Sequence, residues 1–509
     1  MSAAFLEPSI SDSGSDCSPL ERLEQGLAAL RREVSELRCD VGYWKRMHAN
    51  AVARNERLTA ELVEARGEIR VLQDKLFGRK SEKSRSSDRS NDLFDPEQAA
   101  AETKKRGAQP GHKGHDRRDY SHLPVREEFI SLPEESLACA HCGKPAAMMS
   151  DTEDSELLEI DVRPHRRQLR RHRYHATCTC DPARRTLTAP PAPKLIPKGN
   201  YGISIWVHVL LDKYSSYRPT ERLLGQLQEY GLDLPAGTVN DGLCRIEPLL
   251  RPVYEALCQR NRQGDFHQAD ETRWLVFAQS AGKKGHRWWL WVVLAADTTV
   301  YLLDQSRSHD VPEAHFGPKA SGTLEVDRYS GYKAMRQVKS GLMVLSFCWA
   351  HVRRDFVEVG KSWPDLAPWA LDWLRRIREV YRVNRQRLDH RAGSAKFRKQ
   401  DALLRQAMET MRATAVEELS TPKFREPCRR ALQSLQEHWT GLTRFVDDPR
   451  IPLDNNASER AARGPALARK NFYGSGALWS GRLAAMMFSL AATLRHWKIN
   501  PQQWFTAYF

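Results

Sequence analysis

The sequence predicts a multidomain α+β protein, and three observations support that fold class. A heptad repeat occupies the N-terminal segment, two close pairs of cysteines follow, and strand-like apolar runs then alternate with helical segments. A chain of 509 residues is long enough for three or four domains at about 150 residues each. We therefore expect an N-terminal coiled coil, a small zinc-binding module, a helical block similar to a helix-turn-helix, and an α/β core with an all-helical insertion.

Composition narrows the class of partner. The chain has 79 Lys and Arg against 64 Asp and Glu, a net charge of +15, which favours nucleic acid or an acidic membrane surface as the partner. Residues 1–16 lack the basic start and apolar run of a secretory signal, and no stretch approaches the roughly 20 apolar residues that span a bilayer. We expect a cytoplasmic protein that binds nucleic acid, has no membrane partner and keeps its cysteines reduced.

Residues 18–77 predict a coiled coil through which two copies of the chain associate. With Leu20 as position a, 15 of the 17 a and d positions are apolar over eight heptads. Asn55 stands at an a position, where a buried amide fixes the register and favours a dimer. The alternative is a long helix that packs on its own protein, and the heptad pattern favours dimerisation over it.

Residues 78–122 lose this periodicity and are basic, polar and rich in Gly and Ser, which predicts a flexible linker that contacts DNA. A merely solvated tether explains the same composition equally well. The candidate DNA-binding residues in this segment are Lys104, Lys105, Arg106 and Lys113.

Residues 123–198 predict a zinc-binding domain. The four cysteines stand in two close pairs, Cys139 with Cys142 and Cys178 with Cys180. Four thiolates satisfy one tetrahedral Zn²⁺ ion, although reduced cysteines without a metal are the alternative. The histidines that could replace a thiolate as a ligand are His141, His172 and His175.

The run between the cysteine pairs carries many arginines and no acid, which predicts phosphate binding. Its candidate DNA-binding residues are Arg163, Arg166, Arg167, Arg170, Arg171 and Arg173. A run of this kind can also be a solvated face without a ligand.

Residues 199–262 predict a helical block, in which 219–250 read as helix, Gly-containing turn and helix. That spacing suits a DNA-binding helix-turn-helix, but helical hairpins of other function look the same. An α/β core follows in 263–362, and 363–448 predict an all-helical insertion before 449–509 complete the core. The strands are expected at 265–277, 287–296, 299–304, 323–327 and 342–349, with helices at 328–338 and 351–359.

Three acids of this core have the types that two hard divalent cations require. Asp270 lies on or just after the first strand, Asp327 ends the fourth, and Glu459 opens a later helix. Mg²⁺ prefers carboxylate oxygens, and two such ions can support an in-line phosphoryl displacement. Neighbouring Glu271 should point to the opposite face of its strand, because side chains alternate.

Other polar residues accompany the acids. The helix of the third acid could be capped by Asn455, Asn456 or Ser458. Basic residues follow on the same helix and either hold phosphates or pair with acids: Arg460, Arg463, Arg469 and Lys470.

Several ordered strings give these residues a family context. They are LFGRKSEK (76–83), GAQPGHKGH (107–115), the cysteine pairs, ADET (269–272), VDRYSGY (326–332), CWAHVRRDF (348–356), DNNASER (454–460) and ARKN (468–471). Together they resemble the large transposase of the insertion sequence 66 family over nearly the whole chain after about residue 18. One local departure is Phe472-Tyr473-Gly474-Ser475, which is shorter than the aromatic run that usually follows in the family.

The resemblance implies a DDE transposase with an RNase H-like catalytic core and a zinc-binding domain. On it, Asp270, Asp327 and Glu459 are the catalytic triad and hold two Mg²⁺ or Mn²⁺ ions. His351 is a candidate near the active site, although a lone histidine between a strand and a helix is more often structural.

The sequence therefore predicts a DNA transposase of a bacterial insertion sequence. It would bind terminal inverted repeats and catalyse metal-dependent DNA cleavage and strand transfer. The expected partners are double-stranded DNA of the element ends and the target, further copies of the chain as a homodimer or higher oligomer, and helper proteins of the same element. A non-enzymatic DNA-binding regulator and a metal-dependent nuclease without strand transfer are the alternatives.

Overall fold

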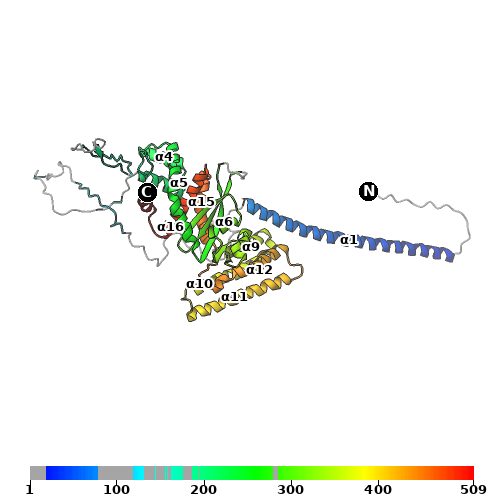
Figure 1. Cartoon of the computed structure of the whole chain (residues 1–509). Helices are drawn as coiled ribbons and strands as arrows, with labels where there is room; N and C mark the ends of the chain where they lie inside the picture. The colour runs from blue at the N-terminus through cyan, green and yellow to red at the C-terminus, as the bar shows by residue number, and fades with distance from the viewer. Residues whose placement is uncertain are drawn as a thin grey trace, which may run out of the picture. The chain divides into compact units, whose positions relative to one another are not determined.

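The computed structural model (Figure 1) divides into two compact units. The described residues are 19–77, 119–130, 141, 144, 155, 157–158, 162–175, 186–192, 194–278 and 285–509. The first unit contains the N-terminal helix with residues 354–378 and 425–428, and the second contains the other described residues. The four predicted zinc ligands and the candidate DNA-binding residues of 78–118 lie outside the described part of the chain.

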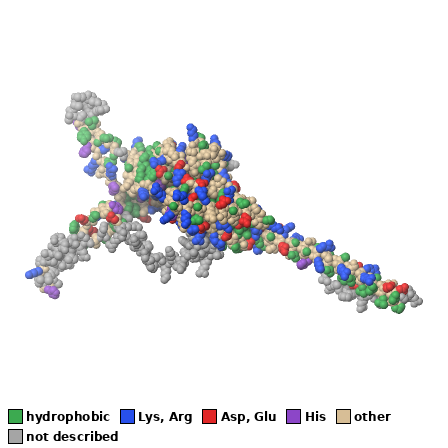
Figure 2. All heavy atoms as spheres, turned by 90° about the horizontal axis from the view of Figure 1, so that it is seen from below, with side chains coloured by type: hydrophobic (Ala, Val, Ile, Leu, Met, Phe, Trp, Pro, Cys, Tyr) green, Lys and Arg blue, Asp and Glu red, His purple; other side chains and the backbone are tan. Residues whose placement is uncertain are grey.

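Helix α1 (Pro19–Phe77) is one continuous helix over the predicted heptads. Its a and d side chains lie exposed on the surface, as with Leu23 at 73% and Ile69 at 53%, and Figure 2 shows apolar side chains along this helix between charged ones. Near its end, Gly67 lies against the Trp363 indole, where a Cβ would overlap the ring. The Arg70 guanidinium also donates to the Ser362 carbonyl at 3.0 Å. These contacts use the face opposite the heptad seam, which leaves the seam uncovered.

The second unit is built on a five-stranded mixed sheet with the order β5-β4-β3-β6-β7. Its strands are β3 (Phe266–Leu275), β4 (Arg287–Leu294), β5 (Thr299–Asp304), β6 (Gly322–Val326) and β7 (Met343–Phe347). The pairs β3–β4 and β4–β5 are antiparallel, whereas β3–β6 and β6–β7 are parallel. All five predicted strands are confirmed, because apolar runs of this length are typical of strands buried on both faces.

One face of the sheet shares its core with six helices. They are α3 (Ile203–Ser215), α4 (Thr220–Glu229), α5 (Ala236–Arg262), α15 (Asn456–Phe472), α16 (Leu478–His496) and α17 (Pro501–Tyr508). Trp274, Leu290 and Tyr301 of the sheet belong to this core, and Figure 1 shows α5, α15 and α16 beside the strands. The helical block predicted in 199–262 therefore packs on the sheet and does not form a core of its own.

The remaining helices lie between the strands and in the predicted insertion. The strand connections contain α6 (Asp310–Phe316), α7 (Ser330–Ala334) and α8 (Arg336–Lys339), and α9 (Trp349–Ser362) follows the last strand, β7. The insertion is helical as predicted: η4 (Pro364–Leu366), α10 (Ala367–Leu388), α11 (Ala395–Ser420), α12 (Glu426–Glu437), α13 (Trp439–Leu442) and α14 (Arg444–Asp447). Helix α6 was not predicted, because seven residues with a proline among them carry no helical period.

Two short strands lie in the segment of the predicted zinc-binding domain. Strand β1 (Arg173–His175) pairs antiparallel with β2 (Thr186–Thr188), and both are exposed. The arginine run from 163 to 173 leads directly into β1. Among the described residues, no helix is long and apolar enough to cross a membrane.

Candidate active site

The sheet brings the first two predicted acids level with each other. Asp270 lies in the middle of β3, and Asp327 directly follows β6. The two strands are parallel, with Gln268 opposite Glu325, so the same register places residue 270 level with residue 327. The two carboxylates thus lie on neighbouring strands at the level where β6 ends.

The third acid reaches the same place from a helix. Glu459 is in the first turn of α15, which packs on β3. Burial, together with the negative charges of Glu271, Asp327 and Glu459, raises the pKa of Asp270 to about 7. The carboxylates predicted from three distant motifs therefore lie close enough to repel one another.

Asn455 fixes the start of the helix that carries Glu459. Its amide Nδ2 donates to the carbonyl of Ala269, beside Asp270, at 2.7 Å. Its backbone N–H donates to the Cys348 sulfur at 3.2 Å, and the Ser458 hydroxyl donates to its carbonyl at 2.9 Å. Of the three predicted caps, Asn455 holds the N-cap position, but its side chain bonds to β3 instead of capping α15.

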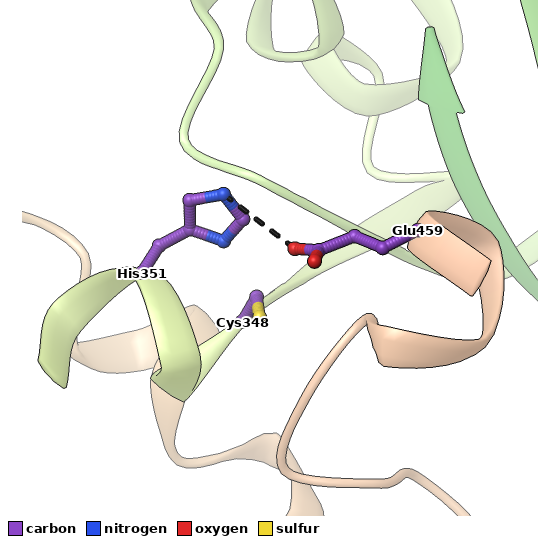
Figure 3. Close-up of side chains that lie close together, drawn as sticks. All are labelled: Cys348, His351 and Glu459. Carbon is purple, nitrogen blue, oxygen red and sulfur yellow. Dashed lines mark ion pairs between the residues drawn. The ribbon is translucent and has the colours of Figure 1, made fainter. Parts of the chain in front are cut away.

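His351 lies beside Glu459, with its Nε2 atom 3.8 Å from the Glu459 carboxylate (Figure 3). The ligand atoms of Cys348, His351 and Glu459 all lie within 4.8 Å of one another. Burial raises the pKa of the Cys348 thiol to about 12, so the sulfur is a neutral thiol that accepts a backbone hydrogen bond. The imidazole and the carboxylate are thus the groups of this cluster best suited to a cation.

The opposite face of β3 carries a second, different carboxylate. Glu271 lies opposite Trp291 in the β3–β4 register, whereas Asp270 lies opposite Val292. The Glu271 side chain is 2% exposed and accepts from the Arg307 guanidinium at 2.6 and 2.8 Å. The Tyr332 hydroxyl donates to its other oxygen at 2.8 Å. The predicted alternation of the two acids is confirmed, and Glu271 is a fully bonded buried acid.

Arg307 also connects this acid to the loop of Asp327. Its guanidinium lies 4.0 Å from the centre of the Tyr329 ring, and the Tyr329 hydroxyl donates to the Arg307 carbonyl at 3.0 Å. The backbone N–H of Tyr329 donates to the Asp327 carboxylate at 2.9 Å. Glu271, Arg307 and Tyr329 therefore form a chain of contacts that positions Asp327.

Comparison with known proteins decides the family. Residues 198–483 match the family model described as "Transposase IS66 family". The chain belongs to the IS66 transposase family. Residues 64–127 also match a model described as "Transposase C of IS166 homeodomain". Membership confirms the resemblance seen in the sequence, and it implies a transposase that acts on DNA and uses divalent metal.

Relatives of this IS66 family chain occur in Sinorhizobium fredii. The uncharacterized protein y4jD is 28% identical over 398 residues, which cover 75% of this chain and 76% of that protein. The uncharacterized protein y4hP is 24% identical over 400 residues, covering 74% and 71% respectively. The likeness therefore extends well beyond the short motifs around the acids.

The basic residues that follow Glu459 in this IS66 family chain differ in their surroundings. Arg460, Arg463 and Lys470 are exposed on α15. The Arg469 guanidinium instead donates to the backbone carbonyl of Arg273 and to the Thr272 hydroxyl. Arg469 thus braces α15 against β3, and the three exposed residues are the ones available to phosphates.

Sequence reasoning missed several residues that support the acids. Tyr329 and Tyr332 stand in the VDRYSGY string, so their nearness to Asp327 in the chain was a usable signal. Arg307 lies between β5 and α6 and stands in no motif. Its role depends on a contact across the sheet that no local pattern encodes.

Proposed function

We propose that the chain is a DNA transposase that cleaves the ends of a mobile element and joins them to target DNA. The observation that carries this proposal is the convergence of Asp270, Asp327 and Glu459, through the β3–β6 register and the packing of α15 on β3. Among the described residues, neither Asp270 nor Asp327 forms a salt bridge with a Lys or Arg side chain. A carboxylate such as that of Asp270, which has no paired cation in a mostly buried site, fits a hard divalent cation.

The residues present supply the oxygen ligands that Mg²⁺ or Mn²⁺ prefers. We propose that Asp270, Asp327 and Glu459 would together hold the two ions. When bound, the two ions supply activation of the attacking hydroxyl and stabilisation of the leaving 3′-oxygen. Tyr329 and Asn455 keep the carboxylates in place through the contacts of their backbone and side chains.

The proposed core is RNase H-like. The supporting features are the mixed sheet, with two acids at neighbouring parallel strands and the third on α15. The helical insertion falls between the second and third acids, as the family resemblance implies. His351 is proposed as a neighbour of the site that holds the Glu459 carboxylate.

We propose that α1 forms a coiled-coil dimer through its a and d positions. Support comes from the exposed apolar seam and from the packing of Gly67 and Arg70 on the other face. Replacing Leu23 and Leu30 by Glu should convert the dimer to a monomer in analytical ultracentrifugation of the full chain. A dimer that persists in this variant would rule out the seam.

We also propose a zinc-binding domain, in which one ion is bound by Cys139, Cys142, Cys178 and Cys180. Elemental analysis should find one zinc per chain, and Cys139→Ser with Cys178→Ser should remove it. The arginine run that begins at Arg163 is proposed to bind DNA phosphates, so its replacement should weaken binding to all sequences.

The decisive experiment is a strand-transfer assay with labelled element ends, target DNA and Mg²⁺. Wild-type protein should produce joined products, whereas Asp270→Asn should bind DNA without cutting it. Glu409→Gln is a matched control, because Glu409 is an exposed acid on α11. Cleavage without joining would favour a nuclease, and binding with neither reaction would favour a regulator.

A further inference from the structure

A pocket lies between the helical block α3–α5 and the loop that joins α15 to α16. Its volume is about 280 Å³, far more than the roughly 30 Å³ that one water occupies in the liquid. Lys213, Thr220 and Asn240 line it from the helical block, and Phe472, Trp479 and Ser480 line it from the other side. The pocket is separate from the carboxylates, although α15 carries both Glu459 and Phe472.

The charged group of this pocket is the ammonium of Lys213, in the last turn of α3. Its Nζ atom donates to the Thr220 hydroxyl at 2.7 Å and lies 4.8 Å from the centre of the Phe472 ring. Burial lowers the pKa of Lys213 to about 8. No Asp or Glu stands among the described residues that line the pocket. The ammonium is therefore drawn out of water towards neutral partners alone, which an anion would correct.

Two helix N-termini add to this positive potential. Ala236 opens α5, and Trp479 and Ser480 stand in the first turn of α16, so both helices begin at the pocket wall. Neither helix has an acidic residue in its first turn. The unpaired N–H groups and the dipole at a helix start favour negative charge.

The loop that closes the pocket is held in one conformation. Gly474 has a φ of 147°, and a Cβ there would overlap the carbonyl oxygen of Leu275. The Ser475 hydroxyl accepts from the Trp274 indole at 3.0 Å, and the Ser475 N–H donates to the Leu275 carbonyl at 2.8 Å. These bonds tie the loop to β3, so the pocket is formed before any ligand arrives.

We propose that this pocket binds a phosphate group of the DNA backbone. The ammonium of Lys213 supplies the charge, and the first turns of α5 and α16 supply N–H donors. We assign the phosphate to DNA because α15 carries Glu459, a proposed catalytic acid, in its first turn and Phe472 at the pocket wall. A DNA strand held at the pocket would therefore be positioned relative to the carboxylates. This inference rests on the proposed function as a DNA transposase.

The test measures binding of the full chain to a 30-base-pair duplex by fluorescence anisotropy over a series of NaCl concentrations. Lys213→Gln removes the charge and should weaken binding about tenfold. It should also reduce the slope of log affinity against log salt by about 0.9, the value for one phosphate contact. Lys399→Gln changes net charge equally at an exposed site on α11 and should leave both quantities unchanged.

A second variant keeps the Lys213 ammonium and adds a negative charge beside it. Asn240→Asp keeps the shape of an exposed side chain at the pocket but adds a carboxylate that competes with a phosphate for Lys213. Its affinity should fall like that of Lys213→Gln, while its melting temperature should not fall. An unchanged salt slope in both variants would overturn the proposal.

Calorimetry with inorganic phosphate distinguishes a phosphate of the DNA backbone from a free phosphate ion as the ligand of the pocket. Binding of inorganic phosphate that Lys213→Gln abolishes, together with a lowered salt slope, supports the DNA phosphate. Binding of inorganic phosphate with an unchanged slope means a free phosphate ligand and overturns the assignment to DNA. If the wild-type chain binds no DNA, the proposed function fails; if it binds and joins DNA while Lys213→Gln behaves as wild type, the pocket alone fails.

Discussion

Asp270 and Glu271 are neighbours on β3, yet the protein surrounds their carboxylates in opposite ways. Glu271 is bonded to Arg307 and Tyr332 within the fold. Asp270 receives one hydrogen bond from a backbone N–H and faces the charges of other acids. The chain therefore supplies a cation to the Glu271 carboxylate and pairs none with the Asp270 carboxylate. A bound divalent ion would supply the missing positive charge.

The largest expected effect concerns the acids of the proposed triad. Asp270→Asn, Asp327→Asn or Glu459→Gln should each reduce strand transfer about 1000-fold or more, because a lost metal ligand removes several kcal/mol of transition-state stabilisation. DNA affinity should stay within about twofold of wild type, since binding rests on basic residues elsewhere. Wild-type joining by any of these variants would contradict the proposed triad.

On the other face of the sheet, substitution of Glu271 should affect the free energy of unfolding more than the activity. Glu271→Gln leaves Arg307 without its charged partner, and we expect a loss of about 1–3 kcal/mol in unfolding free energy. The upper part of that range applies to buried pairs, whereas the Arg307 side chain is 40% exposed. Thermal unfolding measures the loss, and the double variant with Arg307→Met should lose less than the sum of the two single changes.

Glu271 lies on the opposite face from Asp270, but it is not an independent control for the triad. The alternation of side chains predicted a carboxylate remote from the reaction, and the contacts through Arg307 and Tyr329 connect it to Asp327. Partial loss of strand transfer in Glu271→Gln, with the Mn²⁺ affinity lowered, would show that this chain of contacts positions the metal ligand. Glu409→Gln remains the control without such a connection.

In the metal-free protein, Asp270→Asn should raise the free energy of unfolding, whereas Glu271→Gln should lower it. Asp270→Asn keeps an acceptor for the Glu271 backbone N–H but removes one of several repelling charges. We expect the metal-free variant to be about 1 kcal/mol more stable than wild type, as substitutions at strained sites often are. Adding Mn²⁺ should raise the melting temperature of wild type and leave that of the variant unchanged. A metal-free variant that melts below wild type would show that the carboxylates do not repel one another.

The smallest effect is expected at Tyr332. Tyr332→Phe removes the hydroxyl that donates to Glu271 and leaves both bonds from Arg307 in place. The expected loss is about 1 kcal/mol, the usual net worth of one hydrogen bond. A loss as large as that of Glu271→Gln would mean that the hydroxyl, and not the ion pair, satisfies the buried acid.

The sequence predicted the strands and the acids because both are local patterns. Apolar runs marked all five strands, and Asp270 and Asp327 could be placed at strand positions before any contact was known. Arg307 was missed because its partner stands 36 residues away in the chain, and pairing across a sheet leaves no trace in spacing. The two bonds of Asn455 were missed for the same reason: the residue looked like a helix cap, and its amide bonds to a distant strand.

The buried thiol beside Glu459 has a practical consequence for chemical labelling. Maleimides react with thiolates, and a sulfur as buried as that of Cys348 stays protonated and inaccessible. Of the cysteines in the described part of the chain, Cys39 is the exposed one. It lies on α1 at a heptad position that faces away from the a and d seam. In the proposed dimer, a fluorophore on Cys39 would therefore report the distance between the two copies of α1 while Cys348 stays unlabelled.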